Sequence, residues 1–197
     1  MGYALKASRL SAAEYLAWEA GQPQRHEFVD GEVFAMAGAG DAHVTVAGNL
    51  YMALRQHLKG SPCRTYMSDM RLAVAAANCY FYPDVMVTCS AGDHASAQEK
   101  REPVLVVEVL SPGTEGFDRG AKFTAYRALA SLKEYVLIDV GHRTADVYRK
   151  GVDGLWVLHP FERNDVLQLA SVELALSMDD VFAEVLEEAE RPASGDE

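Results

Sequence analysis

The chain has little cysteine, no long hydrophobic run and no excess of basic residues. It contains three cysteines in 197 residues, at Cys63, Cys79 and Cys89. Their odd number and the lack of a Cys-x-x-Cys spacing indicate neither a disulfide framework nor a zinc site. We therefore predict that all three are buried, reduced thiols.

Segments that could cross or enter a membrane are also missing. The longest apolar runs have the length of a β-strand, which is too short to span a bilayer. The amino-terminal residues lack the apolar region of a signal peptide. These absences predict a protein without membrane association and with a cytoplasmic location.

Basic side chains are outnumbered by acidic ones. The chain has 18 lysines and arginines against 29 aspartates and glutamates, which gives a formal net charge of -11. Proteins that coat nucleic acids usually present a basic surface, so this charge argues against DNA binding through electrostatics alone. Many of the acids crowd the carboxyl end, at Glu184, Glu187, Glu188, Glu190, Asp196 and Glu197.

The length and composition are typical of one globular domain. Hydrophobic residues make up 49% of the chain and charged residues 24%, the ordinary profile of a protein with a packed core. We expect a single domain over residues 1–190, followed by a short polar tail at residues 191–197.

The first third of the chain shows three local patterns. A capping box at residues 11–14 predicts a short helix that ends near Trp18. Two strand-like runs joined by Asp-Gly predict a hairpin over residues 26–36. Apolar residues at helical spacing then predict an amphipathic helix from Asp41 to Leu58.

The middle of the chain is richer in strands. Strands are expected at residues 70–75 and 80–87, with a turn near Asn78. The polar, aperiodic residues 90–102 predict an exposed loop. Residues 104–110 form a nearly continuous Val/Leu run, which is typical of a strand covered on both faces.

The last third alternates helices and strands. We expect a helix over residues 118–129, capped by Asp118, and a covered strand at residues 135–139. This strand, helix, strand order predicts a right-handed parallel crossover. Antiparallel strands are expected at residues 145–148 and 155–158, then a strand at 166–169 and a helix after Ser177 with apolar residues to Leu186. The predicted fold is therefore mixed α/β with an antiparallel carboxyl-terminal extension.

Three segments between residues 82 and 123 each carry a charged residue that a simple core would not contain. Asp84 directly follows a proline at the start of a strand-like run, Glu108 lies inside the Val/Leu strand, and Lys122 lies in the first turns of the following helix. A buried carboxylate without a partner costs several kcal/mol, so Glu108 needs one. A divalent cation shared with Asp84 fits, because Mg²⁺ is held by one or two carboxylates together with water and phosphate oxygens.

Two acids and a lysine at one site are the groups that metal-assisted phosphodiester hydrolysis requires. The cation would activate water, and Lys122 would contact the scissile phosphate or the attacking water. Glu27, on the first hairpin strand, could position a second cation or a water. Structural alternatives stay open: Asp84 could cap a turn, Glu108 could form an ion pair with Lys122, and Glu27 could be a surface acid.

Two nearby residues are expected to have structural roles. His43 lies near the start of the second predicted helix and could contact phosphate or metal, but a satisfied or solvent-facing histidine is the expectation. Tyr126 follows Lys122 by about one helical turn and could share its face, but half-buried packing is the simpler expectation.

Four motifs occur in series: His-Glu-Phe-Val-Asp-Gly-Glu-Val at 26–33, Tyr-Pro-Asp-Val at 82–85, Leu-Val-Val-Glu-Val-Leu-Ser-Pro at 105–112 and Asp-Arg-Gly-Ala-Lys-Phe at 118–123. With these motifs the chain resembles the Uma2 (DUF820) family of restriction-endonuclease-like proteins over residues 8–187. The resemblance implies the PD-(D/E)XK nuclease fold, a mixed sheet flanked by helices. It also implies cleavage of DNA that depends on Mg²⁺, with Mn²⁺ as a substitute.

The resemblance further implies roles for single residues. Asp84, Glu108 and the backbone carbonyl of Val109 would hold the metal, Lys122 would be the catalytic lysine, and Glu27 would complete the site. The usual lysine stands two positions after the acid, where this chain has Leu110, so Lys122 on the next helix would replace it.

DNA is thus the expected partner, and a homodimer is plausible because a nuclease that cuts both strands benefits from two sites. Two other functions fit the same sequence. One is an interaction protein that keeps the nuclease fold without turnover, which the acidic charge favours. The other is a metal-dependent hydrolase of a small phosphorylated substrate.

Overall fold

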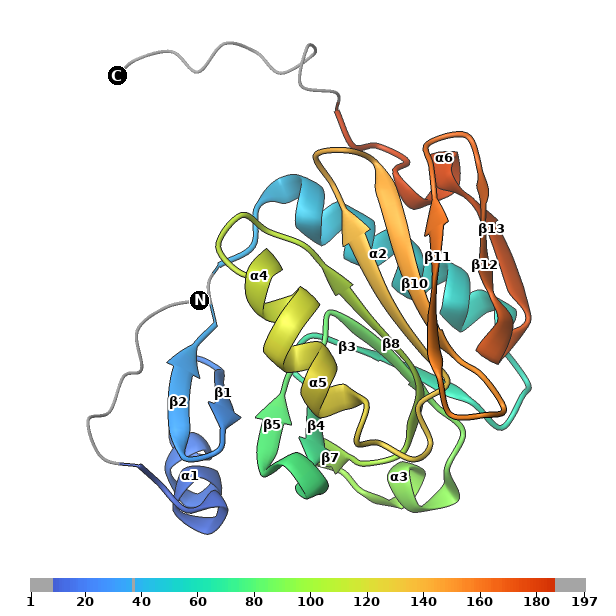
Figure 1. Cartoon of the computed structure of the whole chain (residues 1–197). Helices are drawn as coiled ribbons and strands as arrows, with labels where there is room; N and C mark the ends of the chain where they lie inside the picture. Colours follow the sequence, from blue (N-terminus) through green and yellow to red (C-terminus); the bar gives the residue numbers. More distant parts are fainter. Residues whose placement is uncertain (1–8, 37, 187–197) are drawn as a thin grey trace, which may run out of the picture.

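The computed structural model describes residues 9–36 and 38–186, whose strands form two mixed sheets and a separate hairpin (Figure 1). The five-stranded sheet has the order β2 (Glu32–Ala35), β1 (His26–Val29), β5 (Cys79–Phe81), β4 (Arg71–Val74), β7 (Glu99–Lys100). The six-stranded sheet has the order β11 (Trp156–Phe161), β10 (Thr144–Lys150), β9 (Glu134–Asp139), β8 (Pro103–Val109), β6 (Val85–Thr88), β3 (Arg64–Met67). The hairpin consists of β12 (Val166–Leu169) and β13 (Leu174–Ser177).

Helical elements join and cover these sheets. They are α1 (Ala12–Glu19), α2 (Asp41–His57), η1 (Ala75–Ala77), α3 (Ala91–Ala95), α4 (Glu115–Phe117), η2 (Asp118–Lys122), α5 (Phe123–Tyr126), η3 (Ala170–Val172) and α6 (Met178–Val181). The mixed α/β class predicted from the sequence is confirmed.

The predicted amino-terminal helix and hairpin are both present. The Ser11 side chain accepts a hydrogen bond from the Glu14 amide, and the Glu14 carboxylate accepts one from the Ser11 amide, which completes the capping box. Asp30 and Gly31 have φ values of 42° and 100°, and a two-residue turn with positive φ at both positions matches the twist of a hairpin. Helix α1 packs on this hairpin through Tyr15, Phe28 and Val33.

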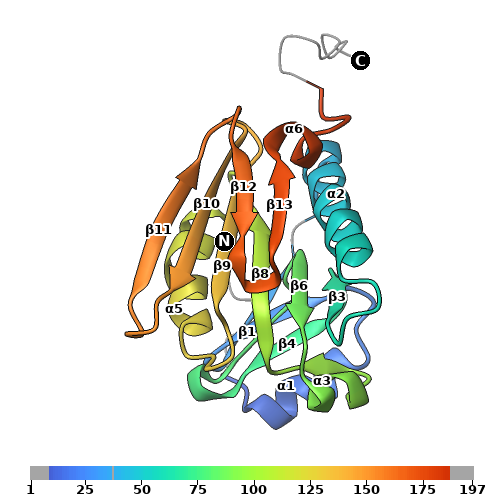
Figure 2. The same cartoon turned by 90° about the vertical axis from the view of Figure 1, so that its right-hand side faces the viewer.

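Both faces of the six-stranded sheet are covered, which explains the continuous Val/Leu run of β8 (Figure 2). Leu105, Val107 and Val109 pack in the same cluster as residues of α2, α6 and the β12–β13 hairpin. Val106 and Leu110 belong to the opposite cluster, with residues of α5 and of the five-stranded sheet. Because successive side chains of a strand point to opposite faces, Glu108 shares the second face.

The crossover that the sequence predicts after β8 is also present. Strands β8 and β9 pair in parallel, with Val107 opposite Val136, and the segment α4–η2–α5 connects them. Strands β9, β10 and β11 then pair antiparallel, as expected for the carboxyl-terminal extension.

The strand predicted over residues 80–87 is divided between the two sheets. Its first half is β5 of the five-stranded sheet, and its second half is β6 of the six-stranded sheet. Pro83 stands between them, and a proline lacks the amide needed to continue a ladder. Asp84 therefore lies where the chain passes from one sheet to the other.

The helix predicted over residues 118–129 begins earlier and contains a π-helical turn. Its first turn follows Thr114, and the wider turn η2 connects α4 to α5. The prediction that Asp118 caps the helix is wrong, because this residue is 3% exposed and lies within the helical segment. Single π-helical turns are frequent at functional sites.

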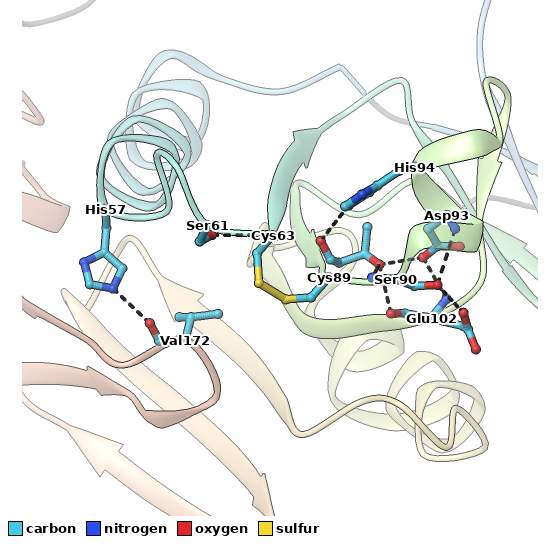
Figure 3. The surroundings of a disulfide bond; sticks show 10 residues. His57, Ser61, Cys63, Cys89, Ser90, Asp93, His94, Glu102 and Val172 are labelled. Carbon is cyan, nitrogen blue, oxygen red and sulfur yellow. Dashed lines mark hydrogen bonds between the residues drawn. A yellow bond between two sulfur atoms is a disulfide. The ribbon is translucent and has the colours of Figure 1, made fainter.

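The prediction of an exposed loop over residues 90–102 is also wrong, because this segment contains α3 and β7. Asp93 is 3% exposed and accepts a hydrogen bond from the Glu102 amide (Figure 3). It also accepts hydrogen bonds from the Thr88 hydroxyl and the Arg101 amide. Lys100 is 2% exposed and donates to the carbonyls of Asp93 and Ser96. The polar composition thus reflects side chains that bond to the segment's own backbone.

The end of the described chain differs in part from the expectation. Ser177 caps α6 by accepting from the Asp180 amide, as predicted, but the helix ends at Val181. Phe182 and Val185 are buried beyond the helix, whereas Leu186 is 53% exposed. Strand β13 was not predicted. The expected polar tail at 191–197 lies outside the described residues.

Three expectations stay predictions: one domain over residues 1–190, a cytoplasmic location and a homodimer. Among the described residues, no helix has the length and apolar character needed to cross a membrane.

Two of the three cysteines form a disulfide, so the prediction of reduced thiols is wrong for Cys63 and Cys89 (Figure 3). Strands β3 and β6 pair antiparallel with Arg64 opposite Thr88, which brings the two flanking cysteines opposite each other with a Cα–Cα distance of 4.0 Å. Cys79 is free and buried, as predicted. Because the pairing depends on strand register, the spacing of the cysteines in the sequence does not show it.

Reduction of the Cys63–Cys89 disulfide should destabilise the fold. The bond spans a sequence separation of 26 residues. Closing a loop of this size stabilises a protein by roughly 3 kcal/mol, because it restricts the unfolded chain. We expect dithiothreitol and Cys63→Ser each to lower the free energy of unfolding in urea by about that amount. Dithiothreitol should not destabilise the Cys63→Ser variant further, and an equal effect on both proteins would contradict the role of this bond.

Candidate active site

Segments far apart in the sequence meet at a cleft of about 470 Å³ beside the junction of the two larger sheets. The four predicted catalytic residues all line it, together with the predicted metal ligand Val109: Glu27, Asp84, Glu108 and Lys122. Glu27 comes from β1, Asp84 precedes β6, and Glu108 comes from β8. The structure therefore brings together every residue that the sequence pattern and the resemblance single out.

Lys122 lies at the centre of a buried group of acids, here called the lysine cluster: Lys122, Glu27, Glu108 and Asp118. Its Nζ is 2.9 Å from Glu27 Oε1, 3.0 Å from Glu108 Oε1 and 3.3 Å from Asp118 Oδ1. The side chains of Glu108 and Asp118 are each 4% exposed, and that of Glu27 is 13% exposed. The ion pair between Glu108 and Lys122, which the sequence left open as an alternative, is thus present.

Local structure explains how these side chains converge. Strand alternation turns Glu108 toward α5 and away from α2. The π-helical turn begins at Asp118 and ends at Lys122, so these residues form an i,i+4 ion pair on the side of the helix that faces β8. The rings of Phe81 and Phe117 lie 5.6 and 5.9 Å from the lysine nitrogen, within the range of cation–π attraction.

Two tyrosines support the lysine cluster from the core. The Tyr126 hydroxyl donates to Glu108 Oε1 at 2.8 Å, and the Tyr135 hydroxyl donates to the Asp118 carbonyl at 3.0 Å. Both side chains are fully buried. The expectation that Tyr126 is half-buried packing is therefore wrong, because its hydroxyl satisfies the carboxylate that the sequence singled out.

Burial and neighbouring charges change the proton affinities of this cluster. Burial raises the pKa of Glu108 well above its ordinary value, and the nearby acids Asp84 and Asp118 raise it further, against the opposing charge of Lys122. Burial alone would lower the pKa of Lys122, but its carboxylate neighbours outweigh burial and raise the pKa well above the ordinary value. Lys122 is therefore charged at neutral pH. One cation thus faces three carboxyl groups, and the raised pKa means that Glu108 takes up a proton more readily than an ordinary glutamate.

Asp84 lies beside this cluster and is held by two donors. The Val109 amide donates to Asp84 Oδ2 at 2.8 Å, and His43 Nε2 lies 3.3 Å from the same oxygen. His43 belongs to the first turn of α2, and its side chain is 19% exposed. Burial alone would lower the pKa of His43, but the hydrogen bond and charge of Asp84 raise it. This histidine is satisfied, as expected, but its partner is a candidate metal ligand.

The donor set suits a hard divalent cation. Among the described residues no group of three or more His, Cys, Asp or Glu side chains is arranged to bind a metal. The predicted set is smaller, with two carboxylates and one carbonyl, and Mg²⁺ commonly uses one or two protein carboxylates with water in the remaining positions. The Val109 amide holds Asp84 beside the strand that carries Glu108, and the carboxyl groups of the lysine cluster outnumber its one lysine.

Sequence reasoning did not assign Asp118, Tyr126 or His43 to the site. A signal existed for the first two, because Asp118, Lys122 and Tyr126 recur at a spacing of four and so can share one helical face. No local pattern connects His43 to Asp84, because that contact depends on how α2 packs beside the sheet junction.

A mixed sheet flanked by helices, with acids and a lysine in a cleft beside it, defines a restriction-endonuclease-like protein. The crystal structure described as a "putative nuclease belonging to DUF820", from Anabaena variabilis ATCC 29413, has this fold. It matches with a TM-score of 0.73 and 18% sequence identity over 88% of this chain and 97% of that one. The family model Uma2, described as "Putative restriction endonuclease", matches residues 12–179. The chain therefore belongs to the Uma2 family.

Two relatives from Synechocystis sp. (strain ATCC 27184 / PCC 6803 / Kazusa) are similar over most of their length. One, the uncharacterized protein slr1290, is 37% identical over 88% of this chain and 92% of its own. The other, the uncharacterized protein sll1609, is 38% identical over 76% of this chain and 85% of its own.

Removing the charge of Lys122 should destabilise the protein strongly. Lys122→Met leaves three buried or nearly buried acids without their shared cation, and breaking a buried ion pair costs about 3–5 kcal/mol. Urea unfolding measures this loss. Adding Glu108→Gln to the variant should recover part of it, because one of the orphaned charges is then removed. A loss below about 1 kcal/mol for Lys122→Met, the range of exposed pairs, would contradict a cohesive role for the cluster.

The metal-free protein should show a His43 ring that stays protonated to higher pH than an ordinary histidine. A histidine whose pKa is raised on folding stabilises the folded state fully below about pH 6.5 and loses this contribution as pH rises through the folded pKa. Asp84→Asn should lower the His43 midpoint in an NMR titration. His142, which pairs with Asp139, serves as the control and should not change. An unchanged His43 midpoint would show that Asp84 is not its partner.

Proposed function

We propose that the protein is an endonuclease that hydrolyses phosphodiester bonds in DNA and depends on Mg²⁺, with Mn²⁺ as a substitute. The observation that supports it best is the convergence of Asp84, Glu108 and Lys122 in one cleft of a restriction-endonuclease-like fold. Membership in the Uma2 family supports the same activity.

In this proposal Asp84, Glu108 and the Val109 carbonyl would hold the cation. When bound, the cation supplies positive charge to the phosphate and Lewis acidity toward water. The amide of Val109 fixes the orientation of Asp84, and Tyr126 fixes that of Glu108. These hydrogen bonds keep both carboxylates in place before substrate binds, which lowers the cost of assembling the site.

Lys122 would stabilise charge on the non-bridging phosphate oxygens or orient the attacking water. An ammonium group has three N–H donors, and in this structure three carboxylates surround it. For Lys122 to contact a phosphate, one of its three ion pairs must therefore break. Glu27 has the most exposed side chain of the three acids, so it is the partner most easily exchanged.

Cleavage of DNA in Mn²⁺ or Mg²⁺ tests the proposal. Glu108→Gln and Asp84→Asn should each reduce cleavage about 100-fold or more, because each removes a metal-binding charge. Glu32→Gln is the matched control, since Glu32 is exposed on β2 at the opposite end of the hairpin strands from the cleft. Its cleavage rate should equal that of the wild type, and chelation by EDTA should abolish cleavage in every sample.

Equal cleavage by the wild type and Glu108→Gln would assign the activity to a contaminant. Two further outcomes would favour the two other functions. Absence of Mn²⁺ binding in calorimetry would favour an interaction protein that keeps the fold without turnover. Hydrolysis of nucleotides without cleavage of polymers would favour a hydrolase of small phosphorylated substrates.

A further inference from the structure

The mouth of the cleft is lined by exposed apolar side chains, here called the apolar rim: Met36, Val44 and Met67. They are 36%, 55% and 36% exposed; Met36 directly follows β2, Val44 lies in the first turn of α2, and Met67 ends β3. Half-buried Phe34 and Phe117 extend this lining toward the lysine cluster. The cleft therefore combines buried acids with exposed apolar side chains.

Basic residues are nearly missing from the same cleft. Among the described residues that line it, Lys122 is the one lysine, His43 is the one histidine, and there is no arginine. Duplex DNA is held mainly by lysine and arginine contacts to its phosphates, and the protein as a whole has a net charge of -11. The described lining thus offers few contacts to the phosphates of either a duplex or a single strand, so contacts to a base must carry more of the binding.

An unpaired base can use the surface that this cleft does offer. Every base has an apolar face that packs on aromatic and apolar side chains with little regard to sequence. The cleft volume of about 470 Å³ lies within the range of roughly 300–1,000 Å³ typical of pockets for small molecules, so a nucleotide can enter. A base inside a duplex would first have to leave its stack, whereas a base of a single strand is already accessible.

We propose that the cleft binds an unpaired nucleotide of single-stranded DNA, with its base on the apolar rim and its phosphate beside Asp84 and Glu108. Such a ligand would match both parts of the lining: Asp84 and Glu108 would hold a cation that supplies positive charge to the phosphate, and the uncharged rim would contact the base. This inference rests on the proposed function and names its substrate as a single strand in preference to a duplex.

Binding measured without cleavage tests the inference. Fluorescence anisotropy in Ca²⁺ would compare three fluorescein-labelled probes of equal length: a thymidine oligonucleotide, its blunt duplex with a complementary strand, and a strand of abasic deoxyribose phosphates. We expect the thymidine strand to bind about tenfold more tightly than either of the others, because only it offers accessible bases.

Variants of the apolar rim locate the contact. Val44→Ser and Met67→Ser should each weaken binding of the thymidine strand about fivefold and leave binding of the abasic strand unchanged. Val157→Ser is the matched control, because Val157 is 52% exposed on the edge strand β11 and does not line the cleft. Competition by thymidine 5′-monophosphate would show whether one nucleotide suffices or a strand is required.

The inference is overturned if the duplex or the abasic strand binds as tightly as the thymidine strand, or if the rim variants bind like Val157→Ser. Cleavage of the same probes in Mn²⁺ is read separately. A protein that prefers the thymidine strand but cleaves none of the probes would retain the binding site and lose the nuclease activity. A protein that cleaves the duplex faster than the single strand would keep the activity and refute this choice of substrate.

Discussion

The salt bridges of Lys122 are the interaction on which the rest of the structure depends. Through them one ammonium group connects β1 of the five-stranded sheet, β8 of the six-stranded sheet and the helical segment between β8 and β9. Burial of these groups is costly, and the cost is offset only while each carboxylate keeps its partner. The relative position of the two sheets is thus coupled to the charge state of the candidate site.

Stability alone does not account for this cluster. Well-packed apolar residues of similar volume can replace a buried ion pair with little loss, and often with a gain, of stability. The lysine cluster instead contains more acids than cations, and burial raises the pKa of Glu108 well above its ordinary value. Such unbalanced, perturbed groups in a cleft are typical of functional sites. Cohesion alone therefore does not explain the excess of acid, which supports the proposal that the site binds a cation.

The sequence shows the part of this site that interrupts a regular pattern. Glu108 could be predicted because a carboxylate within a Val/Leu strand must be buried on one of two covered faces. Asp84 stood out after Pro83, which ends one strand and allows the chain to enter the other sheet. Three other predictions rest on patterns within one segment or in the order of neighbouring segments, and all three features are present: the capping box, the Asp-Gly hairpin and the parallel crossover.

The features that the sequence did not show depend on contacts that no local sequence pattern marks. The sequence predicts Asp118 as a helix cap. In the structure the helical segment already begins after Thr114, and Asp118 is buried in a π-helical turn. Cys63 and Cys89 pair because of the register of β3 with β6. Asp93 and Lys100 are polar and so predicted as exposed, although both bond to nearby backbone and are buried. Strand register decides the disulfide, and hydrogen bonds within one segment or one helix decide the other two cases.

The position of the lysine follows from the packing of β8. Leu110 stands two residues after Glu108, where the usual nuclease pattern has a lysine, and it points to the same face of the sheet. It is 8% exposed and packs in the cluster that contains Tyr126 and Leu137. A lysine there would place its charge among apolar side chains. Lys122 instead reaches Glu108 from the helical segment that covers β8. The end of the strand therefore stays apolar, and the site still contains a lysine.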